Sequence, residues 1–307
     1  MTRVIAYFIP RLLSLLLIVT LTFLLMKFLP GDPFNYEKAL PKEIEKALKN
    51  HYGLNDPLLS QYLRYIKSLV LFDLGPSFRY ENQTVNQIIK SGFPVSALLG
   101  LCALSLGVGG GILLGSLSAC FHRSWPDFLI LALTALSISI PSFILGTLMQ
   151  YFLGLKLGLL PIARWGTFSH LVMPALALAA MPCAFIARLT RTSIIDTLKQ
   201  DFIRTARMKG VSEINILFKH VLRNSLLPVV TYLGPLTSNI LVGSFVVEKI
   251  FAIPGLGQEF VNSVLNRDYT LIMGLTVFYS LLLLIALFVV DILYCLLDPR
   301  MRRSVFA

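Results

Sequence analysis

The chain has 307 residues, of which 56% are hydrophobic and only 14% are charged, and its mean hydropathy is +0.75. Soluble domains carry about 25% charged residues, so this composition excludes an ordinary soluble protein and indicates an integral membrane protein. The formal net charge of +11 does not indicate nucleic acid as a partner, since lysine and arginine collect in the cytoplasmic loops of membrane proteins.

Six apolar segments in chain order predict six transmembrane helices, and each offers roughly the 17 to 25 residues that a spanning helix needs. Their approximate bounds are 8–29, 95–121, 128–155, 171–187, 229–251 and 271–297. The first apolar run is too long for a cleaved signal peptide, and no small-residue cleavage site follows it. The sequence therefore predicts an all-α, polytopic membrane protein whose first segment is an uncleaved helix.

The distribution of lysine and arginine predicts that both termini are cytoplasmic. With the N-terminus inside, the segment from Arg188 to Arg223 contributes eight basic residues to the cytoplasmic side, whereas the two short outer loops contain two each. The long loop at 31–94 has little weight in this rule because of its length.

The same pattern predicts the domain organisation. We expect an N-terminal transmembrane helix in 1–30, an extracytoplasmic loop subdomain in 31–94, a membrane core in 95–297 that includes a cytoplasmic loop at 188–228, and a cytoplasmic tail in 298–307. Within the outer loop, residues 41–50 predict an exposed helix, and the apolar residues after Asp56-Pro57 predict an amphipathic one.

Small residues and prolines mark the predicted spans. Gly107, Gly111 and Gly115 are spaced by four, which is typical of a helix that another helix approaches closely. Prolines inside spanning helices bend the helix axis, and they favour equally either kinked packing or mobile, path-lining helices. These prolines are Pro141, Pro174, Pro182 and Pro235.

The segment 201–230 is too highly charged to cross a membrane. Its ionised residues are Asp201, Arg204, Arg207, Lys209, Glu213, Lys219 and Arg223. At roughly 3 kcal/mol each, they would cost on the order of 20 kcal/mol at the bilayer centre, against a gain of about 6 kcal/mol from the apolar residues. This segment must therefore lie in water or against protein.

Apolar residues nevertheless have helical spacing on both sides of a central break in this segment. Upstream, residues 194, 198, 202 and 206 repeat every four positions, and downstream residues 214, 217, 218, 221 and 222 follow a helical face. Between them, Gly210 can adopt the left-handed conformation that ends a helix, and Ser212 can cap the next helix, with Glu213 in its first turn. The sequence predicts two helices that meet at a glycine-made elbow on the cytoplasmic face.

These observations leave three interpretations of the elbow open. It is an amphipathic helix resting on anionic lipid, a plain basic loop, or a docking site for a cytoplasmic partner. Residue patterns alone do not choose among them.

The elbow resembles the signature loop of permease subunits of ABC importers, whose general form is Glu-Ala-Ala, three residues, then Gly. The segment RTARMKG at 204–210, followed by HVLRNSLLPVV at 220–230, is similar to the variant of dipeptide and oligopeptide permeases, with Arg204 and Thr205 in place of Glu and the first Ala. The segments TFLLMKFLPGDP, SIPSFILG, IPGLGQEFVNSVLNRDYTLIMG and VDILYCLLDPRMRR resemble the same DppB/OppB-like family in the right order.

The resemblance implies the type I ABC importer permease fold in a bacterial inner membrane, with alternating access for peptides. It also implies a second homologous permease subunit, two ABC ATPase subunits that dock on the elbow, and an external solute-binding protein. The residues implied to couple to the ATPase are Arg204, Thr205, Ala206, Arg207, Lys209, Gly210 and Ser212. In the family, Gly210 would set the elbow geometry, Ala206 would be a small contact residue, and the basic residues would pair with acids of the ATPase.

No catalytic residue, metal ligand or cofactor-binding residue is expected in this chain. It has no Gly-x4-Gly-Lys-Ser/Thr segment, so ATP is expected on the partner subunits. The four cysteines lie in or beside apolar runs without a Cys-x-x-Cys pair, which favours a packing role, and the four histidines lack metal spacing. The same scarcity of catalytic patterns argues against a membrane-embedded enzyme.

The main alternative is an ion-coupled secondary transporter. Such proteins usually carry ionisable groups deep in their spans, whereas Lys27, Asp127 and Asp291 lie toward the ends of the predicted segments. The substrate stays open between dipeptides, oligopeptides, nickel chelates and glutathione, because an external binding protein sets most of the specificity in the family.

Overall fold

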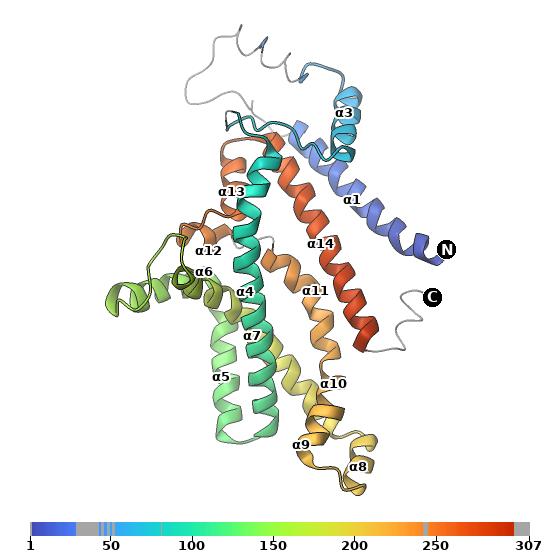
Figure 1. Cartoon of the computed structure of the whole chain (residues 1–307), viewed down its shortest axis with the longest axis vertical. Helices are drawn as coiled ribbons and strands as arrows, with labels where there is room; N and C mark the ends of the chain where they lie inside the picture. The colour runs from blue at the N-terminus through green and yellow to red at the C-terminus, as the bar shows by residue number, and fades with distance from the viewer. Residues whose placement is uncertain are drawn as a thin grey trace.

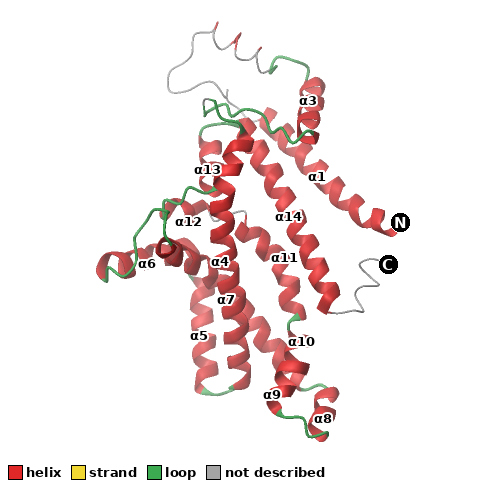
Figure 2. Ribbon diagram, in the orientation of Figure 1, coloured by secondary structure: helices red, strands yellow, loops and turns green. Residues whose placement is uncertain are grey.

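A computed structural model of the chain describes residues 2–28, 53–80, 82–241 and 245–297, together with positions 43, 46, 47 and 50. Six of the ten positions of the expected helix at 41–50 lie outside the described residues, and the expected tail at 298–307 lies wholly outside them. Within the described part of the chain, the elements are helices joined by loops, and no named strand occurs (Figure 2).

The helices form one elongated bundle with its long α4 near the middle (Figure 1). Their bounds are α1 Thr2–Phe28, α3 Leu58–Val70, α4 Val85–Cys120, α5 Trp125–Ser139, α6 Ser142–Met149, α7 Phe168–Leu198, α8 Asp201–Met208, α9 Glu213–Asn215, α10 Leu222–Ser225, α11 Leu227–Leu241, α12 Phe245–Ile250, α13 Leu256–Leu265 and α14 Tyr269–Leu297. Two π-helices, η1 Gln150–Lys156 and η2 Ile216–Val221, continue α6 and α9.

Among the described residues, four helices are long and apolar enough to cross a membrane: Ile9–Phe28 of α1, Val85–Cys120, Phe168–Leu198 and Tyr269–Leu293 of α14. A fifth candidate is the third expected span, in which α5 and the α6–η1 segment are bent by 103°. In the described part of the fifth expected span, the apolar helix is short, Leu227–Thr237 of α11, so the predicted count of six spans is not confirmed. The predicted all-α, polytopic architecture is confirmed.

Two of the expected spans are longer in the structure than their apolar cores. The helix expected at 95–121 begins at Val85, because Thr84 and Gln87 form a reciprocal capping box at its start. The helix expected at 171–187 continues to Leu198, because its polar last turns have helical neighbours to pack against. Helices that leave the apolar layer carry no hydropathy signal, so the sequence predicted the start of α4 too late and the end of α7 too early.

The predicted close approach of two helices at the glycines of α4 is confirmed, and the partner is α7. A Cβ atom built on Gly111 would lie 2.7 Å from Ile186 Cβ and 2.8 Å from the Cys183 carbonyl oxygen. Gly107 is in tight contact with Pro182 in the same way, at 3.2 Å. This pair of helices is the centre of the bundle, and its main apolar core includes Leu99, Ala103 and Ile186.

The bend in the third expected span is at a proline. Ile140 is extended at the end of α5, and Pro141 stands directly before α6. Proline has no backbone N–H and disfavours the helical conformation of the residue before it, so the helix breaks there. The α6–η1 segment then projects sideways from the bundle (Figure 1).

At the end of the bundle opposite the elbow, a buried carboxylate holds the loop before α4 against α14. Asp268 is 1% exposed and accepts hydrogen bonds from the Ser77 hydroxyl, from the Phe78 backbone N–H at 3.2 Å and from the Leu271 backbone N–H at 3.1 Å. It thereby caps the start of α14 and fixes a segment almost 200 positions earlier in the chain.

Candidate functional site

The predicted elbow is present as a sharp reversal between α8 and α9, at the lower tip of the bundle in Figure 1. Gly210 has φ +74°, the left-handed conformation that the sequence predicts for it. The Gly210 N–H donates to the Arg207 carbonyl at 2.9 Å, and the Val211 N–H donates to the Ala206 carbonyl at 3.2 Å. These two bonds form the Schellman motif that ends a helix at a glycine.

The second helix starts where the sequence predicts, but its cap differs in detail. Ser212 is the N-cap of α9, yet its side chain makes no capping hydrogen bond. Glu213 in the first turn instead accepts from Arg207, with Nε to Oε1 at 2.8 Å and Nη2 to Oε2 at 3.1 Å. Hydrogen bonding to the Arg207 guanidinium lowers the pKa of Glu213, so the carboxylate stays ionised and the elbow is closed by an exposed ion pair.

An apolar cluster seats the elbow on the ends of α4 and α7. Its buried members are Ala119, Ile194, Ile203, Ala206, Ile216 and Val221. The Ser225 hydroxyl, which is buried, donates to the Thr197 hydroxyl at 3.1 Å and ties α10 to α7. The elbow is therefore fixed to the two central helices of the bundle. If the elbow moves, α4 and α7 must move or repack with it.

The predicted apolar face of the second helix is only partly correct. Val221 is buried, but Ile214 is 70% exposed and Phe218 is 67% exposed, while Ile216 is fully buried in their place. The cause is the π-helix η2, whose wider turns bring the five-spaced Ile216 and Val221 to the same side. A prediction based on α-helical periodicity therefore assigns the wrong residues to the buried face of this helix.

The outer surface of the elbow combines exposed apolar and basic side chains. Met208 is 80% exposed and lies in this surface with Ile214 and Phe218. We call these three residues the apolar tip. Arg204, Thr205, Arg207, Lys209, Gly210 and Ser212 are also exposed, whereas Ala206 is 9% exposed and packs inward in the seating cluster. Exposed apolar clusters rimmed by polar residues are typical of protein-binding sites.

A buried carboxylate near the elbow joins α4, α5 and α7. Asp127 is 3% exposed and accepts from Arg191 of α7, from the Ser118 hydroxyl of α4 and from the Arg123 backbone N–H at 2.9 Å. Arg191 also lies 3.0 Å from His122 Nδ1. The sequence placed Asp127 near a span end, and it did not predict its pairing with Arg191.

Another buried carboxylate, on the far side of the core, was not predicted from the sequence. Glu248 of α12 is fully buried and accepts from the Ser96 hydroxyl at 2.8 Å and from the backbone N–H groups of Gly257, at 2.9 Å, and Gln258, at 3.3 Å. A Cβ on Gly257 would lie 2.9 Å from its carboxylate. The available signal was an acid at the end of an apolar run, followed closely by a Gly-x-Gly segment.

Comparison with known proteins identifies the family. A family model described as "binding-protein-dependent transport system inner membrane component" matches residues 111–303. The chain belongs to this family. It is a multi-pass bacterial inner-membrane permease component, and the family model spans the elbow, its seating cluster and the buried carboxylates of Asp127 and Glu248.

Curated relatives cover nearly the whole length of this permease component. It is 50% identical over 289 residues to the dipeptide transport system permease protein DppB of Bacillus subtilis, covering 94% of each chain. It is 41% identical over 291 residues to the oligopeptide transport system permease protein OppB of Haemophilus influenzae, covering 94% of this chain and 95% of the relative. The predicted resemblance to DppB/OppB-like permeases is confirmed.

Solved structures show the same fold. The permease component is similar to a chain of the MetNI methionine ABC transporter in an inward-facing conformation, with TM-score 0.58, 18% identity, and coverage of 69% of this chain and 97% of that one. It is also similar to a chain of an amino acid ABC transporter, with TM-score 0.54 and 16% identity. The fold is that of type I ABC importer permeases. Among the described residues, no group of three or more His, Cys, Asp or Glu side chains could hold a metal ion.

Proposed function

We propose that this chain is one permease subunit of an ATP-driven importer for peptides of the dipeptide or oligopeptide class. The observation that carries the proposal is the 50% identity to a dipeptide permease over 94% of both chains. An external solute-binding protein delivers the peptide, and a second homologous permease subunit completes the path. Two ABC ATPase subunits bind and hydrolyse ATP, and this chain acts as a membrane subunit without ATPase chemistry of its own.

We further propose that the elbow is the contact with the ATPase subunit. Two features support this role: the apolar tip is exposed on a rigid projection, and basic residues Arg204 and Lys209 flank it. A surface with an apolar centre and a basic rim is better suited to bind a protein groove with acidic edges than to face solvent. Ala206 contributes from the inner side of α8, because its small side chain is buried in the seating cluster.

The mechanism follows from how the elbow is seated. When ATP binding closes the two ATPase subunits, the docked elbow moves with them. Because the seating cluster fixes the elbow to α4 and α7, those helices move as well, and Asp127 transfers the displacement to α5. Rigid coupling of this kind converts a change at the elbow into a change of access across the membrane.

The substrate proposal is tested with the complete transporter in proteoliposomes. ATP inside and a labelled dipeptide with its binding protein outside should give uptake that stops when either the ATPase subunits or the binding protein is omitted. Unlabelled dipeptide should compete, whereas a nickel chelate or glutathione should not. Uptake driven by an ion gradient without ATP would show that the chain is a secondary transporter instead.

The docking proposal is tested at the apolar tip. Met208→Glu and Phe218→Glu place a carboxylate in the proposed contact and should weaken co-purification of the ATPase subunits at least tenfold. Leu59→Glu is the matched control, because Leu59 is 69% exposed on α3 at the opposite end of the bundle. Equal ATPase recovery in all three variants would rule out the tip as the contact.

A further inference from the structure

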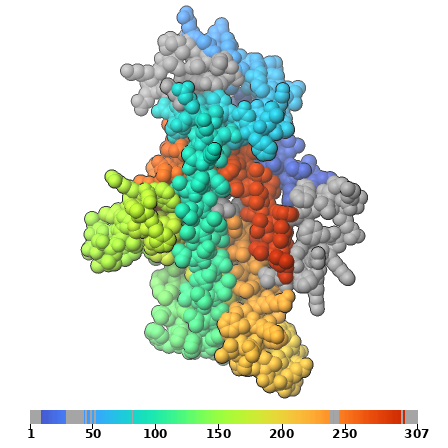
Figure 3. Space-filling view, in the orientation of Figure 1, coloured from blue at the N-terminus to red at the C-terminus, as the bar shows by residue number. Residues whose placement is uncertain are grey.

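Helix α3 presents an exposed apolar stripe at the end of the molecule away from the elbow (Figure 3). The stripe consists of Leu59, Leu63 and Val70, whose side chains are 69%, 58% and 72% exposed. Spacings of four and seven residues bring these side chains to one face of the helix. We call these three residues the outer stripe. An exposed apolar row of this kind indicates contact with something outside the chain.

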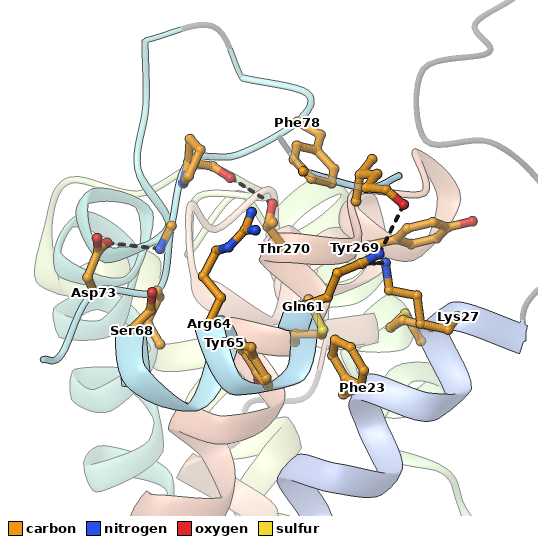
Figure 4. A pocket seen from close by; sticks show the side chains of 17 residues that line it. Phe23, Lys27, Gln61, Arg64, Tyr65, Ser68, Asp73, Phe78, Tyr269 and Thr270 are labelled. Carbon is orange, nitrogen blue, oxygen red and sulfur yellow. Dashed lines mark hydrogen bonds between the residues drawn. The ribbon is translucent and has the colours of Figure 1, made fainter. Parts of the chain in front are cut away.

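The opposite side of α3 faces the bundle. The α3 side chains that line the cavity shown in Figure 4 are Gln61, Arg64, Tyr65 and Ser68. At about 100° per residue, the outer stripe lies on the side of the helix opposite to these four residues. Ser60 and Lys67 lie between the two sides and are exposed. The outer stripe is therefore turned away from the bundle, and a polar side runs next to it.

Contacts with α1 place α3 beside a membrane-spanning helix. The hydroxyls of Tyr62 and Thr20 lie 2.7 Å apart, and the Tyr62 ring packs on Phe23 with centroids 5.4 Å apart. The candidate span of α1 is Ile9–Phe28. Thr20 lies eight positions before the end of this span, which is about 12 Å along the helix axis. A helix that contacts the span at this depth lies at the level of the lipid.

The exposed surface of α1 is continuous with this contact. Leu24 is exposed and lies four residues after Thr20 and three before Lys27, so it flanks the row of side chains that meets α3. Leu17 and Phe28 are also exposed and lie on the same face as Leu24. A helix that crosses a membrane presents such side chains to the acyl chains. The lipid-facing surface of α1 therefore extends up to α3.

The turn after α3 also exposes apolar side chains. Leu71 and Phe72 follow the helix directly and are exposed. Phe72 has φ +56°, a left-handed conformation that is uncommon for a bulky residue. The side chain of Asn86 on α4 holds this turn, because it donates to the Phe72 carbonyl at 2.7 Å and accepts from the Leu74 N–H at 2.9 Å. The turn thus keeps a large aromatic side chain out of the core.

We propose that α3 is an interfacial helix whose outer stripe, together with Phe72, contacts the lipids of the outer leaflet. The leaflet is the outer one because the elbow is expected on the cytoplasmic side and α3 lies at the other end of the bundle (Figure 1). An apolar stripe with Lys67 beside it suits the boundary between acyl chains and headgroups. The depth of the contact with α1 favours lipid over the solute-binding protein as the occupant. The helix anchors the outer segment to the membrane, whatever substrate the importer carries.

The test measures which reagents reach α3 in the complete transporter in proteoliposomes. Spin labels are attached singly at Leu63→Cys and Val70→Cys, after the native cysteines have been replaced by alanine. Ser60→Cys and Lys67→Cys are the matched controls, because they are exposed on the polar side of the same helix. Oxygen concentrates in the bilayer, whereas a chromium complex stays in water. The ratio of relaxation by oxygen to relaxation by the chromium complex should be several-fold higher at the two stripe positions than at the controls.

Three results would overturn the lipid contact. An equal ratio at all four positions would show that α3 lies in water. Weak relaxation by both reagents at Leu63 and Val70 would show that another part of the transporter covers the stripe. Access to the stripe that is lost only after the solute-binding protein is added would identify α3 as a docking surface for that protein.

A second measurement does not depend on labels. The double variant Leu63→Glu with Val70→Glu places two carboxylates in the outer stripe, and carboxylates are unfavourable in the acyl layer. Protease cleavage of the outer segment in proteoliposomes should therefore rise several-fold. Ser60→Glu with Lys67→Glu carries the same two carboxylates on the polar side and should be cleaved at the wild-type rate. Equal cleavage of the two double variants would contradict the proposal.

Discussion

Arg191 and Asp127 form a two-point ion pair across the base of the elbow: Nε donates to Oδ1 and Nη2 donates to Oδ2, each at 2.7 Å. The pair joins α7 to the start of α5, 64 positions apart in sequence. The side chain of Asp127 is 4% exposed and that of Arg191 is 18% exposed, so the pair is shielded from salt and water. It connects the helix above the elbow to the helix that bends at Pro141.

Loss of one partner of this pair should destabilise the protein strongly. Asp127→Asn leaves Arg191 with a neutral neighbour, and the expected cost is about 3 kcal/mol in the free energy of unfolding. The measurement is thermal unfolding of the detergent-solubilised transporter. The double variant Asp127→Leu with Arg191→Met should recover part of the loss, because no uncompensated charge remains. A double variant less stable than either single variant would contradict this account.

The conformation of Gly210 gives a separate prediction. A residue with a Cβ at φ +74° is strained by roughly 1 to 2 kcal/mol, although no atom lies within 4 Å of the position that a Cβ would occupy. Gly210→Ala should therefore slow transport by distorting the elbow. Gly210→Asn is the informative comparison, since asparagine tolerates the left-handed region.

The two Gly210 variants separate conformation from contact. If the glycine serves only the turn, Gly210→Asn should transport at close to the wild-type rate. If the ATPase subunit approaches the backbone closely, both variants should hydrolyse ATP with reduced peptide uptake. Wild-type coupling in Gly210→Ala would show that the elbow geometry is not needed.

Packing of α4 on α7 predicts a sharp difference between two neighbouring glycines. Gly111→Leu would drive a side chain into Ile186 and the Cys183 carbonyl, so at least 3 kcal/mol of stability should be lost, or the protein should fail to assemble. Gly109→Leu, on the same helix, meets no atom within 4 Å of its Cβ and should be tolerated. Expression and thermal unfolding of both variants provide the measurement, and equal behaviour would refute the packing role.

Glu248 should tolerate even an isosteric change poorly. Glu248→Gln replaces one acceptor oxygen by an NH2 group, which faces donors such as the Ser96 hydroxyl and the Gly257 N–H. An unsatisfied donor pair in a buried site should cost about 1 to 3 kcal/mol. Glu259→Gln is the control, because Glu259 is only part-buried and accepts from the Tyr80 hydroxyl at 2.8 Å. The assay is protease sensitivity of the outer segments, and it should rise only in Glu248→Gln.

Much of the fold could be predicted because it follows from local rules. Hydropathy marks a helix wherever the chain is surrounded by lipid, and spacing by four marks Gly107, Gly111 and Gly115 as contact positions. Gly210 could be placed correctly because few residues other than glycine adopt φ near +74° at a helix end. These features depend on residues close together in the sequence, so they can be predicted without knowledge of the fold.

Other features depend on contacts between distant segments and gave no such signal. The π-turns of η2 move Ile214 and Phe218 to the surface, although their spacing is that of a buried face. The burial of Ala206 in the seating cluster and the network around Glu248 arise only once distant helices have packed together. Spacing alone assigned residues to a helix face, and tertiary packing decided which face was buried.

The central claim is that the elbow transmits ATP hydrolysis to peptide movement, and the ratio of dipeptide imported to ATP hydrolysed tests it most directly. The ratio is measured in proteoliposomes that contain the complete transporter and its binding protein, with wild type and Met208→Glu compared at equal amounts of bound ATPase subunits. The account predicts that Met208→Glu lowers the ratio several-fold while ATP hydrolysis continues. An unchanged ratio in Met208→Glu and Gly210→Ala alike would contradict it.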